Sequence, residues 1–233
     1  MLIPARRIAQ FCLLTLVAQC ALALVTVPAE LTWNETQQAT AREIVNRLET
    51  RHYAKVPFDD QLSSQMLDQY LKTLDFNRLF LLASDIKDFE QWRFQLDDQL
   101  HKGDLQTGYA IFARYQQRVI ERLNQVVADL DTTIANLDFT RDEYLELDRS
   151  KQAWPADQAE ADSLWRKRIK SEVLNLKLAG KAPEEIPPLL KKRFNNQLHR
   201  VQQYSSEDVY QTYLNALTEL YDPHTNYLSP RTS

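Results

Sequence analysis

Residues 105–137 read LQTGYAIFARYQQRVIERLNQVVADLDTTIANL, the longest stretch of the chain that keeps a single pattern. Apolar side chains recur in it at spacings of three and four, at Phe112, Tyr115, Val119, Leu123, Val126, Leu130, Ile134 and Leu137. The stretch has no proline, and it has no glycine after Gly108. Because this spacing puts the apolar side chains on one face of a helix, it predicts a long helix against which shorter helices pack.

The flanking sequence repeats this periodicity in shorter pieces that begin at capping residues. Asn34, Ser84, Asp157 and Ser205 are side chains that accept hydrogen bonds from the first turn of a helix. The additional helices are predicted over residues 35–52, 60–74 (starting at Asp60 or Ser63), 84–103, 158–179, 183–203 and 205–221. We therefore expect an all-α, irregular multi-helix domain of about seven helices, which ends in an extended Asp-Pro-His-Thr segment.

Two connections between the predicted helices carry large apolar side chains. The cluster Phe76, Leu79, Phe80, Leu81 and Leu82 has no strand-like alternation and predicts a buried turn. Residues 138–155 lose the helical pattern, and Trp154 precedes Pro155, which excludes it from regular helix. We expect this segment to be an ordered connection in which Trp154 fills a gap between helices.

The C-terminal part of the chain is dense in aromatic residues. The set consists of Phe194, Tyr204, Tyr210, Tyr213, Tyr221 and Tyr227. Such a set favours core or inter-domain packing, and a partly exposed set that receives a partner helix is the alternative. If a further part of the protein normally covers this end, we expect the aromatic cluster to be the exposed apolar patch.

The N-terminus has the pattern of an export signal. Arg6 and Arg7 precede an uncharged apolar run from residue 8 to 29. We predict a signal peptide at residues 1–23 with cleavage after Ala23, and a weaker alternative site at Val27-Pro28-Ala29. An uncleaved anchor and a lipid-modified Cys20 are the two other interpretations. The periplasm is therefore the predicted location, with membrane association left open.

The composition excludes several classes of function. Cys12 and Cys20 are the only cysteines and both precede the predicted cleavage site, so the mature chain would have no thiol chemistry. The net charge of −4 argues against a nucleic-acid partner, which requires a basic face. The four histidines, His52, His101, His199 and His224, show no zinc-binding spacing, and structural or exposed roles are favoured for them.

The search for a catalytic site in the sequence is negative. Ser84 and Lys87 form a Ser-x-x-Lys pattern, but its usual partner motifs are missing and a helix N-cap accounts for Ser84. Ser150 and Lys151 are adjacent and would point apart. His224 lies in a proline turn, where a structural role is favoured. We therefore predict no catalytic, cofactor-binding or metal-binding residue, and no cofactor.

Two motifs resemble those of the carboxy-terminal processing peptidases, specifically the long tail-specific proteases of the bacterial periplasm. One is Leu147-Asp148-Arg149-Ser150-Lys151-x-x-Trp154-Pro155, and the other is Asp222-Pro223-His224-Thr225-Asn226-Tyr227-Leu228-Ser229-Pro230. The stretches 81–85 and 206–210 are also similar, so the resemblance covers essentially all of the mature chain.

The resemblance implies a division of the protein. Residues 24–221 would be the helical N-terminal domain, and residues 222–233 would begin the connection to a PDZ domain and a Ser/Lys-dyad protease core, neither of which is in this chain. The chain by itself would then be inactive in a serine endopeptidase family. Its implied roles are those of a scaffold and a docking surface. The implied partners are protein substrates with exposed C-termini, a tetratricopeptide-repeat lipoprotein adaptor, and peptidoglycan hydrolases as substrates. The alternative is a free-standing periplasmic helical protein-binding module without peptidase activity.

Overall fold

The structure, a computed structural model, describes residues 31–229, so the predicted signal peptide and its cleavage site lie outside the described residues. Within that range the chain is all-α, with eight α-helices, two short 3-10 turns and no strand. In chain order these are α1 (Glu35–Thr50), α2 (Asp60–Leu74), α3 (Ala83–Phe89), η1 (Glu90–Trp92), α4 (Leu96–Lys102), α5 (Gln106–Ala135), α6 (Gln158–Leu178), η2 (Pro183–Glu185), α7 (Ile186–Gln202) and α8 (Ser206–Tyr221). None of the helices between residues 31 and 229 is long and apolar enough to span a bilayer.

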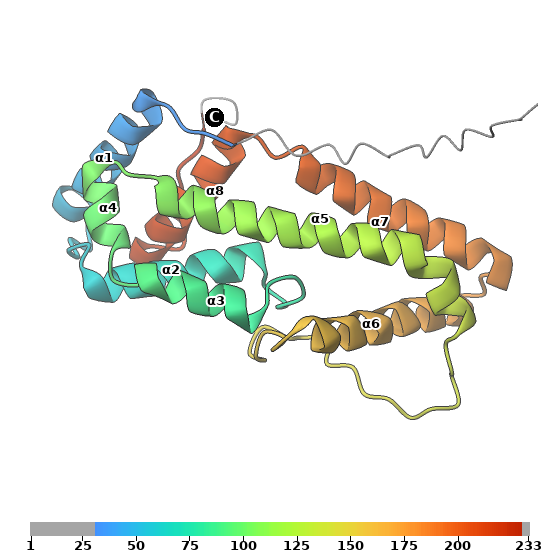
Figure 1. Cartoon of the computed structure of the whole chain (residues 1–233). Helices are drawn as coiled ribbons and strands as arrows, with labels where there is room; N and C mark the ends of the chain where they lie inside the picture. The colour runs from blue at the N-terminus through green and yellow to red at the C-terminus, as the bar shows by residue number, and fades with distance from the viewer. Residues whose placement is uncertain (1–30, 230–233) are drawn as a thin grey trace, which may run out of the picture.

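The long helix α5 joins two hydrophobic cores (Figure 1). Its first turns lie in what we call the α2–α8 core, which also receives α1, α4 and the segment before α3. Its remaining turns lie in the α6–α7 core, which consists mainly of α5, α6 and α7. Helix α7 runs along α5, whereas a long connection carries the chain from the end of α5 round to the start of α6 (Figure 1). The prediction of one scaffold helix is confirmed.

Most helices begin where the sequence predicts. The side chains of Asn34, Asp157 and Ser205 accept hydrogen bonds from backbone N–H groups of the first turn of α1, α6 and α8, respectively. Helix α2 begins at Asp60 and is capped by Asp59. These bonds satisfy N–H groups that have no partner inside the helix, which is why polar side chains at these positions fix where a helix starts.

The helix predicted over residues 84–103 is wrong as a single element, because the chain divides it into α3, η1 and α4. Ser63, buried in α2, donates its hydroxyl to the carbonyl of Arg93 at 2.8 Å and accepts from the N–H of Leu96 at 3.0 Å. These contacts hold the backbone in an irregular turn between η1 and α4. Helix α3 also starts two residues early, with Leu82 in place of Ser84 as the N-cap residue.

The segment between α2 and α3 wraps around the carboxylate of Asp75. Asp75 accepts the backbone N–H groups of Leu79, Phe80 and Leu81 at 2.8–3.1 Å, and it is almost fully buried. Burial raises the pKa of this carboxyl, while the backbone hydrogen bonds act to lower it. The predicted buried turn is confirmed for Leu81 and Leu82, but Phe76 is half exposed because it lies at the outer side of the loop.

Trp154 takes the position that was predicted for it. Its ring packs against the α2–α8 core, and its indole N–H lies 3.3 Å from Oδ2 of Asp75. The guanidinium of Arg78 covers the other side of the ring, 4.1 Å from its centroid. The connection before α6 is thereby tied to the loop after α2.

The aromatic residues near the C-terminus are mainly core residues. Tyr210 and Tyr213 have no exposed surface, and Tyr221 is buried. Core packing is therefore confirmed for these residues of α8, whose rings face α2 and α5, so they form no exposed patch. Tyr204 is 40% exposed and Tyr227 is partly exposed. The most exposed large apolar side chains lie elsewhere, at Leu178, Tyr53, Leu147 and Tyr144.

Candidate functional site

The residues that the sequence singled out for catalysis do not form a site. Ser84 and Lys87 are both exposed on α3. The residue between them with a structural role is Asp85, whose carboxylate accepts the N–H of Leu82 at 2.9 Å. Between residues 31 and 229, no group of three His, Asp or Glu side chains is arranged to hold a metal ion.

The four histidines are placed separately. His101 lies 3.2 Å from a carboxylate oxygen of Glu49, and His199 lies 2.9 Å from the amide nitrogen of Gln203. His224 is exposed. His52 lies 3.3 Å from the hydroxyl of Thr225, so it belongs to the contacts that hold the C-terminal motif.

The Asp-Pro-His-Thr motif forms a turn that is held by His52 and Tyr53, in the segment just after α1. Asp222 accepts the N–H of His224 at 2.7 Å, and the N–H of Thr225 reaches the carbonyl of Asp222 at 2.9 Å. Aspartate followed by proline is a common start for such a turn, since the carboxylate accepts a nearby N–H and proline presets its backbone angle. The hydroxyl of Tyr53 donates to Asp222 at 2.7 Å. The hydrogen bond from Tyr53 and then the N–H of His224 lower the pKa of Asp222.

Beyond the turn, the chain runs back along α8. The side-chain amide of Asn215 makes two hydrogen bonds to the backbone of Tyr227, accepting its N–H at 2.7 Å and donating to its carbonyl at 3.2 Å. The N–H of Ser229 lies 3.3 Å from the side-chain oxygen of Gln211, one turn earlier in α8. Residues 222–229 therefore form a segment that is fixed to α1 and α8, and we call it the clamped segment.

A row of arginines on α5 was not recognised from the sequence. Arg114 and Arg118 both bind Asp85, with contacts of 2.9 Å. Burial raises the pKa of Asp85, but the hydrogen bonds from Arg118, the Leu82 N–H and Arg114 outweigh it, and the pKa is lowered. Arg122, one turn further along α5, binds Asp162 of α6 at 2.6 Å. The spacing of four between these arginines indicates that they share one face of α5. The sequence does not identify their acidic partners, because these come from distant segments.

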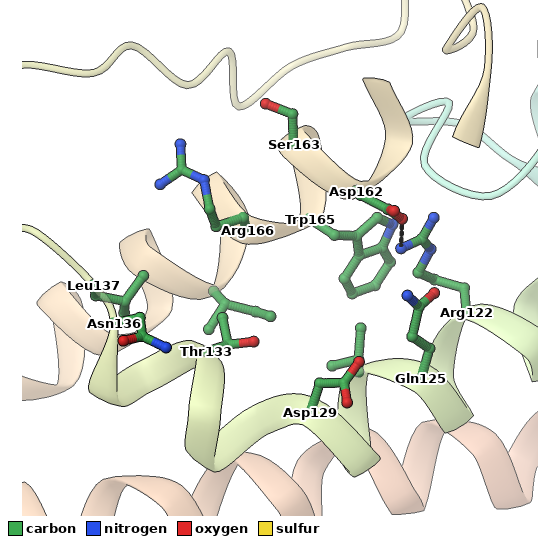
Figure 2. A pocket seen from close by; sticks show the side chains of 12 residues that line it. Arg122, Gln125, Asp129, Thr133, Asn136, Leu137, Asp162, Ser163, Trp165 and Arg166 are labelled. Atoms are coloured by element: carbon green, nitrogen blue, oxygen red, sulfur yellow. Dashed lines mark hydrogen bonds and ion pairs between the residues drawn. The ribbon is translucent and has the colours of Figure 1, made fainter. Parts of the chain in front are cut away.

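Between α5 and α6 lies an open slot of about 380 Å³ (Figure 2). Val126, Trp165 and Ile169 line it but are almost fully buried, whereas Gln125 and Asp129 are exposed. The Arg122–Asp162 ion pair lies at one end of the slot, and Leu137 lies toward the other (Figure 2). The indole N–H of Trp165 donates to the carbonyl of Leu79 at 2.9 Å, which orients this ring.

Comparison with known proteins gives a consistent result. The family model described as "Tail specific protease N-terminal domain" matches residues 44–231. A curated relative, the "Tail-specific protease" of Haemophilus influenzae, is 38% identical over 201 residues. The aligned region is 86% of this chain but 28% of that relative, so the chain spans well under half of the relative's length. The chain belongs to the family of tail-specific protease N-terminal domains, as its two motifs indicated.

Proposed function

We propose that this chain is the non-catalytic helical scaffold and docking region of a periplasmic tail-specific serine endopeptidase. Its substrates are proteins with exposed C-termini, among them peptidoglycan hydrolases, and a tetratricopeptide-repeat lipoprotein adaptor is the proposed delivery partner. The proposal rests on the family and on the motif resemblance. Peptidase activity belongs, in this view, to a longer protein that contains the PDZ domain and the Ser/Lys dyad.

The observation that carries the scaffold role is the clamped segment. Asn215 holds both backbone polar groups of Tyr227, and Tyr53 and His52 hold the turn at Asp222 and Thr225. In a longer protein, the chain that follows this segment would leave α8 at a defined place and direction. A helical domain with such a fixed exit supports the positioning of a downstream domain, without taking part in bond cleavage.

A peptidase assay tests the proposal. The 233-residue chain and the same chain extended by its downstream reading frame are each incubated with a peptide that has an apolar free C-terminus. We expect cleavage only by the extended protein. Cleavage by neither protein would favour the free-standing binding module, and cleavage by the short chain would contradict a non-catalytic role.

A substitution tests the role of the clamped segment in the extended protein. In Asn215→Ala, both bonds to Tyr227 are lost. At roughly 1 kcal/mol for each lost hydrogen bond, we expect peptidase activity to fall about ten- to thirtyfold. Asn195→Ala is the matched control, since Asn195 is exposed on α7 and far along the chain from the clamped segment. Equal activity of the two variants would show that the clamp does not position the protease.

A further inference from the structure

Beyond its turn, the clamped segment has the alternation of an extended chain. Thr225, Tyr227 and Ser229 are partly or fully buried, whereas Asn226 and Leu228 are exposed. A period of two is the pattern of a β-strand with one covered face. Within residues 31–229, however, this stretch bonds to side chains of α8 and not to another strand.

The bonds to α8 use only one edge of the extended stretch. The side-chain amide of Asn215 bonds to both the N–H and the C=O of Tyr227, and the N–H of Ser229 lies 3.3 Å from the side-chain oxygen of Gln211. Asn215 and Gln211 are about 6 Å apart along the helix axis, which matches an advance of about 6.6 Å over two extended residues. In an extended chain, the polar groups of neighbouring residues point to opposite edges. The intervening residues therefore direct their backbone groups away from α8.

This second edge has no partner in the part of the chain that the structure describes. No hydrogen bond from residues 31–229 reaches the backbone N–H or C=O of Asn226 or Leu228. An unpaired edge of this kind is a template for pairing with another extended chain. Position 230 is a proline, which has no N–H to donate, so the edge suits a short segment.

A groove of about 670 Å³ lies between the clamped segment and α1. Tyr227 forms one side of it, and residues of α1, among them Ala39 and Ile44, form the other. No residue of α8 lines the groove, so it lies on the side of Tyr227 that faces away from α8. Ala39 is exposed, and Ile44 and Tyr227 are partly exposed, so their side chains are accessible to a partner. The charged side chains of Glu43 and Arg47 at the rim bind each other at 2.6 Å.

We propose that this edge and groove receive an extended segment of a partner protein. Its backbone pairs with Asn226 and Leu228, and one of its apolar side chains lies on Ala39 and Ile44. The edge selects an extended chain, because a helix uses its own N–H and C=O groups internally. The groove selects an apolar side chain, because its accessible floor is formed by aliphatic and aromatic groups. This binding requires no peptidase activity, so this proposal and the proposed protease link can fail separately.

The backbone N–H signals of the ¹⁵N-labelled 233-residue chain test the pairing in NMR titrations. The probe is the acetylated and amidated pentapeptide Thr-Val-Thr-Val-Thr. Its counterpart has a methyl group on every backbone nitrogen, so it keeps the side chains but cannot donate. We expect the first peptide to shift the N–H signals of Asn226 and Leu228 saturably, and to shift that of Tyr227 less, since this N–H is already bonded to Asn215. The methylated peptide should bind at least about fivefold more weakly.

A pair of variants tests the edge. Leu228→Pro removes one outward N–H and leaves the two bonds between Tyr227 and Asn215 possible, whereas Leu228→Ala keeps the N–H and removes only the side chain. The proline variant should bind the unmethylated peptide about fivefold more weakly than the alanine variant does. An unchanged Tyr227 signal in both variants shows that the clamped segment is still held to α8.

A second pair tests the groove without altering the clamped segment. Ala39→Arg fills the groove from the exposed side of α1, whereas Ala113→Arg makes the same change at an exposed position of α5 outside it. Only the first variant should weaken the peptide, by at least about fivefold. Equal affinity for the two peptides, equal effects within either pair of variants, or unmoved signals of Asn226 and Leu228 would each overturn the proposal.

Discussion

The two cores hold their helices together in different ways. In the α2–α8 core, tyrosine hydroxyls donate to backbone carbonyls of other segments: Tyr70 to Gly108 at 3.0 Å, Tyr210 to Gln37 at 2.9 Å and Tyr221 to Val56 at 2.9 Å. In the α6–α7 core, the helices are linked at their edges by ion pairs, Arg122–Asp162, Lys191–Asp131 and Arg193–Glu172.

This difference determines how rigidly the helices of each core are held together. A buried hydroxyl–carbonyl bond fixes the separation of two segments closely, because leaving either group unpaired inside the protein is costly. An exposed ion pair contributes little and is screened by salt. Within the α6–α7 core, α7 packs closely along α5, whereas α6 has few contacts with α5 and the slot lies between them.

The largest expected effect on stability comes from replacing a glycine by alanine, and it should differ between Gly108, at the start of α5, and Gly180, after α6. A Cβ at Gly108 would lie 2.5 Å from ring atoms of Tyr213, which has no exposed surface and no room to move. Gly108→Ala should lower the free energy of unfolding by about 2–3 kcal/mol. Gly180 follows α6 with a φ of 81° and open space around it, so Gly180→Ala should cost only about 1 kcal/mol, for backbone strain. Urea unfolding followed by circular dichroism measures both, and equal losses would contradict the contrast in packing.

The second prediction compares the buried carboxylate of Asp85 with the partly exposed carboxylate of Glu143. The pKa of Asp85 is lowered in the folded protein, so its ionised form stabilises the fold above the unfolded value of about 3.9, and this contribution is lost as the pH falls through the lower folded value. Asp85→Asn should lower stability at neutral pH by about 2 kcal/mol. The variant should also lose less stability than the parent when the pH drops below about 4.

Glu143 supplies the comparison for this prediction. Its bonds from Arg166 and Lys170 lower its pKa to about 2, but its side chain is 15% exposed, whereas that of Asp85 is 1% exposed. Glu143→Gln should therefore change stability much less than Asp85→Asn does, because water replaces the lost contacts. Chemical denaturation of both variants at neutral and acidic pH gives the result. If Glu143→Gln lowers the free energy of unfolding as much as Asp85→Asn does, ion pairs of partly exposed carboxylates contribute more to stability than we infer.

The smallest expected effect is the response to salt. Raising the NaCl concentration to about 0.5 M screens the ion pairs at the edges of α6 and α7. Amide hydrogen exchange in α6 should then become about twofold faster, while exchange in α2 and α8 stays unchanged. Hydrogen-exchange mass spectrometry resolves these helices, and a uniform change along the chain would remove the distinction between the cores.

The failed prediction of one helix over residues 84–103 shows where sequence reasoning stops. The pattern over residues 84–103 is compatible with one helix, and nothing within it marks the break. The break depends on Ser63, which bonds to Arg93 and Leu96 from about 30 positions earlier in the chain. The same is true of Asp75, whose acidic side chain in an apolar region gave no sign that it organises the next loop and receives the indole of Trp154.

The sequence by itself determined the all-α class, the starts of α1, α6 and α8, the scaffold helix α5 and the family, because caps, periodicity and motifs act between residues that are close in the chain. The tertiary structure alone decided that Arg114 and Arg118 bind Asp85, that Arg122 binds Asp162, and that a slot with Asp129 lies beside them. The reason is physical: a charge or a buried hydroxyl finds its partner through space, and the pairing depends on which helix faces are brought together.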